Sequence, residues 1–175
     1  MIVVRDPATR EALVPLIVPT LQRYIAQVQI GESPWNTVHP TRLGAAEIAA
    51  APAPEAMIRK LTHAPVVLMV FADLAYIASF DSQLDRVGVI SGASIYPFVW
   101  NILLAARKEG YGGTLTTFAA GREPDVQQLL GVPAHYAFAA MLPLGRPVRQ
   151  LTRLRRNPVD DFVRLERWDG APLGQ

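Results

Sequence analysis

Residues 98–118, FVWNILLAARKEGYGGTLTTF, decide the fold, because a long apolar helical pattern stops there at glycines and becomes a threonine-rich run. The helix is expected over residues 87–108, which are apolar on every side but broken by serines, a proline and an asparagine. Residues 114–118 are short and β-rich, typical of a strand. The expected helix end lies at Gly110, Gly112 and Gly113.

Two continuous apolar runs flank this stretch and predict buried strands. They are residues 64–74, APVVLMVFADL, and residues 136–145, YAFAAMLPLG. Between the glycines and the second run, residues 123–131 predict a helix, which Gly131 closes. Strands and helices therefore alternate along the chain, which indicates an α/β or α+β fold with a mostly buried sheet.

The N-terminal third predicts a short strand, a long helix and a long loop. Residues 2–4 are a strand, either at a sheet edge held by its neighbours or deprived of a segment upstream. Asp6 is placed to cap a helix with Pro7 at its first position, and prolines 15 and 19 are expected to kink or divide that helix. Residues 31–54, rich in Pro, Gly and Ala, predict a loop with one short helix at 45–50.

Composition narrows the class of protein. The 175 residues fit a single domain over 1–175, in which 146–175 form a basic C-terminal segment and tail. Half of the residues are hydrophobic and 18% are charged, which excludes disorder and suggests a buried subunit interface. The chain has no cysteine, so disulfides, thiolate metal sites and cysteine catalysis are excluded.

The sequence predicts no membrane partner and a cytoplasmic location. Residues 87–106 reach the length of a membrane span, but their polar interruptions and the charged 107–109 that follow favour a core helix. Acidic and basic residues also interrupt the N-terminus too early for a secretory signal.

Five arginines lie within eleven positions in residues 145–156, GRPVRQLTRLRR, and contribute to a pI of about 9.2. Such a cluster is either an anion site or a solvated basic surface. Binding to nucleic acid is disfavoured, because no aromatic residues are interleaved with the arginines and no nucleic-acid-binding motif accompanies them.

The chain resembles the FMN-dependent nitroreductase family over nearly its whole length. The resemblance lies in residues 98–118, in LLGVPAHYAFAAMLPLGRP at 129–147, and in an arginine-rich segment that ends with RNPVDDFV at 156–163. The opening VVRDPATREAL at 3–13 is also similar to the family's first strand and following helix. The resemblance implies an α+β fold, a three-layer α/β/α sandwich with a central, mostly antiparallel sheet.

The resemblance also implies which residues hold FMN. The family's basic segment before a proline grips the flavin phosphate, which places phosphate contacts at Arg155 and Arg156, with Arg153 in reserve. Guanidinium groups suit this role because they bind phosphate through two hydrogen bonds. The family's short strand passes the flavin ring near N5, which assigns Leu115, Thr116 and Thr117 to the ring. Without the resemblance, these three residues would simply suit a strand.

No catalytic residue and no metal site are predicted. His39, His63 and His135 lack partners at metal-ligand spacing and are interpreted as loop or strand-edge residues. Asp81, Asp85 and Arg86 lie where relatives line a substrate pocket, although a solvated link explains them at least as well. Hydride transfer from nicotinamide through flavin needs no protein nucleophile.

Two functions therefore remain open. The first is a homodimeric oxidoreductase that uses FMN to carry hydride from NADH or NADPH to a nitroaromatic, quinone or similar acceptor. The second is a non-catalytic relative that binds flavin weakly or not at all and acts in binding or interaction.

The resemblance further implies that the family's N-terminal flavin-binding segment is missing. In the family, a basic and serine-containing segment precedes the first strand and contacts the flavin phosphate. This chain starts at that strand, so FMN is expected to bind weakly and the purified chain to be largely colourless.

Overall fold

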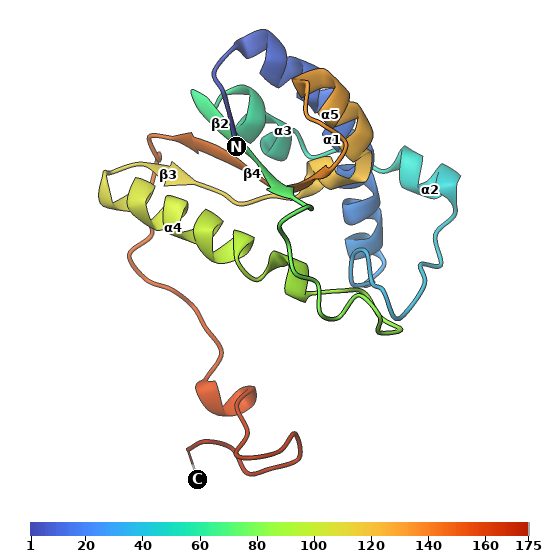
Figure 1. Ribbon diagram of the computed structural model, residues 1–175, viewed down its shortest axis with the longest axis vertical. Helices are drawn as coiled ribbons and strands as arrows, with labels where there is room; N and C mark the ends of the chain where they lie inside the picture. The colour runs from blue at the N-terminus through green and yellow to red at the C-terminus, as the bar shows by residue number, and fades with distance from the viewer. Residues whose placement is uncertain (175) are drawn as a thin grey trace.

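The computed structural model describes residues 1–174 as a four-stranded antiparallel sheet between two helical layers (Figure 1). This arrangement confirms the expected α+β, three-layer α/β/α sandwich. The strands lie in the order β1-β2-β4-β3. They are β1 (Ile2–Val4), β2 (Val66–Asp73), β3 (Gly112–Gly113) and β4 (Tyr136–Gly145).

The two long strands form the centre of the sheet. β2 and β4 pair from Val66 with Leu144 to Asp73 with Tyr136, and the register shifts once, between Val70 and Phe71. Their side chains alternate between two apolar cores, because successive residues of a strand face opposite sides. β1 pairs with β2 and forms one edge of the sheet.

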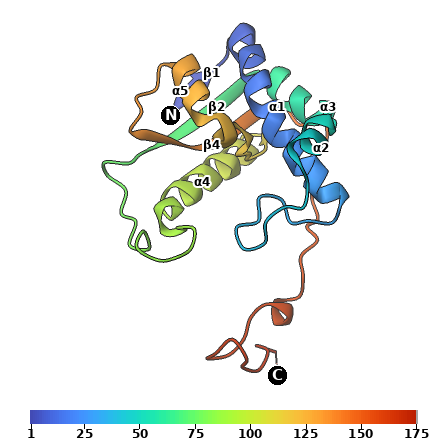
Figure 2. The same cartoon turned by 90° about the vertical axis from the view of Figure 1, so that its right-hand side faces the viewer.

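Helices cover both faces of the sheet (Figures 1 and 2). One face carries α1 (Pro7–Gln29), α3 (Glu55–Thr62) and α5 (Glu123–Leu130), and the other carries α4 (Ile95–Lys108). The first core joins Leu13, Ile17 and Leu21 of α1 to β2 and β4. The second core lies around Val99 of α4.

α1 begins as the sequence predicts. Asp6 caps it, because the Asp6 carboxylate accepts a hydrogen bond of 2.9 Å from the backbone N–H of Thr9. The helix continues through Pro15 and Pro19 and is not divided there. Packing of one α1 face into the first core compensates for the two backbone hydrogen bonds that the prolines cannot make.

The loop over residues 31–54 and its short helix are confirmed, with α2 at Ala45–Ala50. α3, which follows at once, was not predicted from the sequence. It is short and starts after a proline, but Met57, Ile58 and Leu61 pack into the first core.

The prediction that a helix begins at residue 87 is wrong, because α4 begins only at Ile95. Residues before it form a loop and a single 3₁₀ turn, η1 (Ile90–Gly92). The buried carboxylate of Asp81 accepts hydrogen bonds from the amides of Val89 and Ile90 at 2.7 and 3.4 Å. These bonds hold both amides in the loop and leave helix formation to the residues that follow.

Residues 114–118 do not form the continuous strand that the sequence predicts. β3 forms at Gly112–Gly113, and beyond it only Thr116 pairs with β4, as an isolated bridge to Met141. A 3₁₀ helix, η2 (Phe118–Arg122), follows. α4 ends where the glycines predict, and Gly110 adopts a left-handed φ of 82°.

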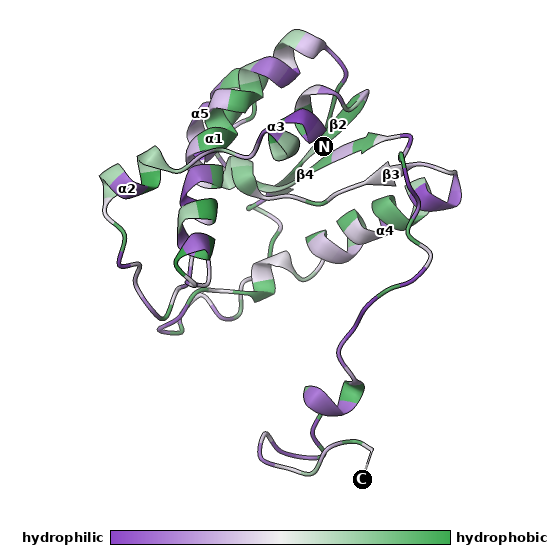
Figure 3. Ribbon diagram, turned by 180° about the vertical axis from the view of Figure 1, so that it is seen from behind, coloured by the Kyte–Doolittle hydropathy of each residue, from purple (hydrophilic) through white to green (hydrophobic). Residues whose placement is uncertain are grey.

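After β4 the chain leaves the body of the molecule as an extended tail (Figures 1 and 2). The tail contains one 3₁₀ turn, η3 (Val159–Asp161). Apolar residues run along β2 and occur at several positions on α1 and α4 (Figure 3). Within residues 1–174, no helix is both long and apolar enough to span a bilayer.

Candidate functional site

A pocket of about 690 Å³ lies beside the segment that the sequence assigns to a flavin ring. A cavity of this size suits a cofactor or drug-sized ligand. Its wall combines the C-terminal half of α1, α3, the start of η2 and the loop after α1. The lining residues, mostly apolar or aromatic, are Ile17, Thr20, Leu21, Tyr24, Pro34, Trp35, Met57, Lys60, Leu61, residues 114–118, Ala120, Gly121, Met141 and Pro143.

The structure brings Leu115, Thr116 and Thr117 together on this wall. Thr116 anchors them to β4, since its N–H donates to the Met141 carbonyl at 3.0 Å and its carbonyl accepts from the Met141 N–H at 2.9 Å. Neighbouring amides in an extended segment point to opposite sides. The N–H groups of Leu115 and Thr117 therefore point away from β4, and neither makes a hydrogen bond within residues 1–174.

The Thr116 hydroxyl is a buried polar group without a partner in the described part of the chain. An unpartnered buried hydroxyl destabilises a fold, and its presence on a pocket wall is consistent with a ligand that completes it. Gly121 adds a close contact on the same wall, because a Cβ at this position would collide with Thr20 Oγ1. The unpartnered hydroxyl fits a ligand with hydrogen-bonding atoms at its edge, and the close contact shows that η2 packs tightly against α1 along this wall.

Lys60 of α3 is the one cationic side chain that lines the pocket, and no carboxylate in the described chain lines it. The site therefore favours a neutral or anionic ligand. Sequence reasoning missed Lys60 because it missed α3. The available signal was the apolar spacing of Met57 and Leu61, which places Lys60 beside a core-facing position.

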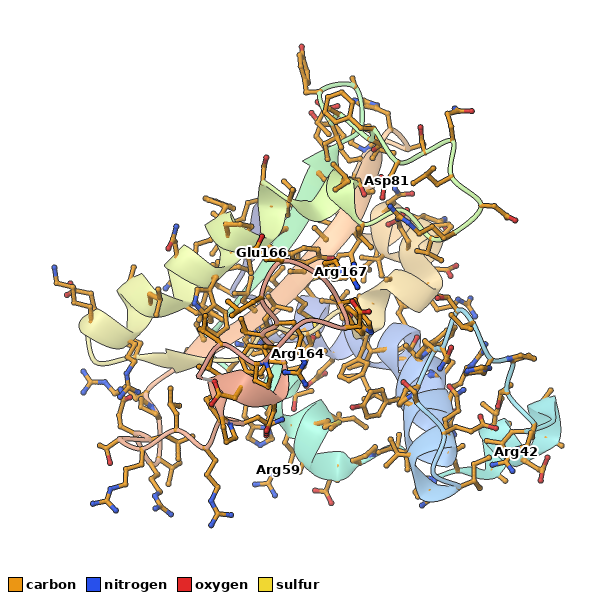
Figure 4. The ribbon with its side chains drawn as sticks, turned by 90° about the horizontal axis from the view of Figure 1, so that it is seen from below. Arg42, Arg59, Asp81, Arg164, Glu166 and Arg167 are labelled. Atoms are coloured by element: carbon orange, nitrogen blue, oxygen red, sulfur yellow. The ribbon has the colours of Figure 1, made fainter. Side chains whose placement is uncertain are left out.

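The loop after α1 forms the pocket rim and depends on Glu32. Its carboxylate accepts from the Thr41 hydroxyl at 2.6 Å, from the Arg42 N–H at 2.9 Å and from Arg42 Nε at 3.2 Å. The Thr41 hydrogen bond, followed by the Arg42 amide, lowers the pKa of Glu32 from 4.5 to about 2. Arg42 lies on this loop, and Arg59 lies separately on α3 (Figure 4).

Asp81 lies outside the pocket, in the loop between β2 and α4 (Figure 4). The amide of Val89 and then the Arg86 guanidinium, at 2.7 Å, lower the pKa of Asp81. Asp81 is 4% exposed, whereas Asp85 and Arg86 are exposed, so the interpretation as a solvated link holds for those two residues and not for Asp81. Its contacts give it a structural role in holding this loop.

The arginines assigned to a phosphate lie elsewhere. Arg153, Arg155 and Arg156 are exposed on the tail and do not line the pocket. The tail is tied to the end of α4 just before them, because Arg107 donates to the Leu151 carbonyl at 2.7 Å and to Gln150 Oε1. Within one chain, residues 115–117, which are assigned to the flavin ring, are therefore separate from the three arginines assigned to its phosphate.

The three histidines do not form a site. His39 lies in the loop after α1, His63 at the end of α3 and His135 just before β4. Across residues 1–174, no group of three or more potential metal-ligating side chains is present.

The sequence pattern of the nitroreductase family matches residues 1–146, so the match ends where the basic segment begins. Among solved structures, the chain is similar to iodotyrosine deiodinase bound to FMN and 3-iodo-L-tyrosine, with 17% identity and a TM-score of 0.59. This match covers 95% of the chain and 75% of the deiodinase.

Two further structures share the fold at comparable identity. Nitroreductase A from Vibrio parahaemolyticus has 18% identity and a TM-score of 0.60, with 99% of this chain and 59% of that chain covered. The NADPH:FMN oxidoreductase from Vibrio harveyi, complexed with NAD⁺, has 18% identity and a TM-score of 0.57, with coverages of 99% and 60%. The chain thus spans about three fifths of the length of these two proteins.

Proposed function

The chain belongs to the nitroreductase family, and from this premise we propose that it is an FMN-dependent oxidoreductase. It would take hydride from NADH or NADPH and deliver it to a nitroaromatic, a quinone or a similar acceptor, as a cytoplasmic homodimer with a single domain over 1–175. The observation that supports this most is the 690 Å³ pocket, whose wall carries the unpartnered hydroxyl of Thr116.

The pocket wall offers a row of donors to the edge of a flat ring. Leu115 and Thr117 would donate through their free amides, and Thr116 through its hydroxyl. When bound, FMN supplies the redox chemistry, as it accepts hydride from the nicotinamide and passes it to the acceptor. The protein's part is to fix the ring and to place donors where negative charge develops.

Lys60 and the apolar lining would stabilise the negative charge that develops on the flavin ring. Lys60 is the one cationic side chain that lines the pocket within residues 1–174, and no carboxylate there lines it, so the charge on the wall favours an anionic ring. The apolar side chains of Leu21, Leu61 and Met141 would keep water from a ring bound against them, which would strengthen the electrostatic interactions of that ring.

Arg155 and Arg156, with Arg153 in reserve, would grip the flavin phosphate. Because the tail leaves the body, these arginines could reach a pocket only after the tail packs against a body, either its own or that of a second copy. Each guanidinium would then form charge-assisted hydrogen bonds with the phosphate.

The proposed homodimer is supported by exposed apolar surface. Phe98, Trp100 and Leu104 of α4 are about half exposed, and Val99 is the only buried residue of this helix in the described chain. The tail adds further exposed apolar residues, including Phe162 and Trp168. A surface of this kind is typical of a face that another protein covers.

A second candidate function is favoured by the distance between tail and pocket. With Arg153, Arg155 and Arg156 away from the ring segment, the fold could serve as a non-catalytic scaffold that holds flavin weakly. Only the first candidate is expected to bind FMN saturably and to have the bound FMN reduced by NADH or NADPH.

The experiment titrates FMN into the wild type and into Thr116→Val, and measures the FMN dissociation constant of each from the change in flavin absorbance. The Thr116 hydroxyl has no partner within residues 1–174, so Thr116→Val should leave the unfolding free energy equal or slightly higher. FMN affinity should fall about threefold to tenfold, which corresponds to one hydrogen bond.

Thr152→Val is the matched control, because Thr152 is exposed on the tail and does not line the pocket. Its FMN affinity should stay close to that of the wild type. Binding of FMN without reduction by either nicotinamide would favour the non-catalytic candidate, and no binding by the wild type would contradict the proposed function.

A further inference from the structure

Trp35 on the pocket rim has a backbone conformation that is unusual for its type. Its φ is 54°, in the left-handed region that large side chains rarely enter. Glu166, in the tail, is the only other non-glycine residue with a positive φ in the described chain. A strained residue persists only where its surroundings determine its position, and such residues gather at functional sites.

Two side chains from α1 hold Trp35 in place. The backbone N–H of Trp35 donates to Gln27 Oε1 at 3.1 Å, and Gln27 is 2% exposed. Gln27 Nε2 in turn donates to Glu32, the carboxylate that organises the same loop. The guanidinium of Arg23 lies over the indole ring, 4.0 Å from its centroid, in a cation–π contact.

The Trp35 side chain does not pack into either hydrophobic core. It is 43% exposed and it lines the 690 Å³ pocket together with Tyr24 and Phe118. Tyr24 and Phe118 already pack against each other edge to face, with ring centroids 5.7 Å apart. Arg23 covers one face of the indole, and the ring has no aromatic partner within residues 1–174, so its other face is available to a ring that enters the pocket.

We propose that Trp35 stacks on the isoalloxazine ring in this pocket, and that Gln27 and Arg23 are the positioning residues that hold the indole there. The proposal rests on the proposed function, because it assumes that the pocket binds flavin. It assigns the strained loop residue a binding role that no motif in the sequence announces. The indole supplies apolar area and π-stacking, and donors on the 115–117 wall would fix the ring edge.

The test measures the excited-state lifetime of bound FMN. Free FMN fluoresces, and an indole in contact with the flavin ring quenches that fluorescence by electron transfer, whereas a distant indole does not. Every protein carries Tyr24→Phe, which keeps the aromatic ring and removes a second quencher. Trp35→Phe should lengthen the lifetime of bound FMN severalfold, and Trp35→Ala should also raise the FMN dissociation constant about tenfold.

The chain provides its own matched controls, since Trp100 and Trp168 are exposed and do not line the pocket. Trp100→Phe and Trp168→Phe should leave the lifetime as it is in the parent protein. Gln27→Met keeps Trp35 but removes the acceptor for the Trp35 backbone N–H. The indole should then lose its position beside the ring, and the lifetime of bound FMN should lengthen as in Trp35→Phe.

The outcomes separate this inference from the proposed function. If Trp35→Phe binds FMN with the parent's affinity and lifetime, the stacking role is overturned and the flavin site stands. If neither the wild type nor the Tyr24→Phe parent binds FMN, both are overturned. A lifetime that lengthens equally in all three tryptophan variants would likewise overturn the specific role of Trp35.

Discussion

At the scale of single residues, Glu32 links the chemistry of a carboxylate to the shape of the pocket. It receives hydrogen bonds from Thr41, Arg42 and Gln27, and Gln27 holds Trp35 on the rim. These bonds are strongest with an ionised carboxylate, which explains the lowered pKa. Protonation of Glu32 should therefore loosen the rim before it affects the core.

The pH dependence of stability should show this effect. The pKa of Glu32 is about 2 in the folded chain and its usual value is 4.5, so its stabilising contribution is complete above pH 4.5. That contribution is lost as the pH falls from 4.5 towards 2. Urea unfolding of Glu32→Gln and wild type over this range should show a flatter pH dependence for the variant. Parallel curves would contradict the role of Glu32.

Two arginines of the basic segment test the phosphate assignment. Arg156→Ala should weaken FMN binding about tenfold to a hundredfold, the range of a charge-assisted contact. Arg149→Ala removes the same charge a few residues earlier and should have little effect. Calorimetric titration measures both, and equal losses in the two variants would point to a general effect of charge on the tail.

At the scale of elements, the pocket depends on how closely η2 lies against α1. Gly121 permits this approach, because any larger residue would place a Cβ against Thr20 Oγ1. Phe118 at the start of η2 packs against Tyr24 of α1. The end of α1 and the start of η2 therefore form one wall, and a small displacement of either would change the pocket.

Gly121→Ala should destabilise the fold by about 1–3 kcal/mol, the usual cost of overpacking. Thr20→Ala removes the hydroxyl that collides with the new Cβ, so Gly121→Ala should cost much less in that background. Urea unfolding of the four proteins in this double-mutant cycle measures the coupling. Additive losses would show that the Thr20 contact is not the reason for glycine at 121.

The elements with local signals were predicted from the sequence, and those that depend on distant contacts were not. Asp6 and Pro7 identify the start of α1, and the short helix at 45–50 was found. The start of α4 was misplaced because Asp81 binds amides eight and nine residues later, which no local pattern reveals. α3 was missed because its stability comes from packing on α1 and the sheet.

The candidate site was predicted in part. Family resemblance identified Leu115, Thr116 and Thr117, which the structure places on the pocket wall. Lys60 and Trp35 were not found, because each reaches the pocket through tertiary packing of a segment without a motif. The roles of all five residues toward a flavin remain predictions.

At the scale of the whole molecule, one chain leaves much apolar surface uncovered. The outer side of α4, the loop between β2 and α4, and the tail all carry exposed aromatic residues, among them Phe80, Trp100 and Trp168. A homodimer is expected to bury part of this surface, and the tail is the segment with the longest reach from the body (Figure 1).

Sedimentation should therefore give a species of twice the 19.2 kDa chain mass at micromolar concentration. Trp100→Glu places a charge on the exposed face of α4 and should shift the protein towards the monomer. Leu129→Glu is the control, since Leu129 is also partly exposed but lies on α5, in the opposite layer. A wild type that sediments as a single 19.2 kDa monomer would contradict the dimer.

The central claim, that the pocket between α1, α3 and residues 114–118 holds the flavin, is tested most directly by a crystal structure of the full chain grown with FMN. We predict isoalloxazine density in this pocket, with the amides of Leu115 and Thr117 and the hydroxyl of Thr116 within hydrogen-bonding distance of the ring. FMN bound elsewhere, with the pocket still empty and the Thr116 hydroxyl still unpartnered, would contradict it.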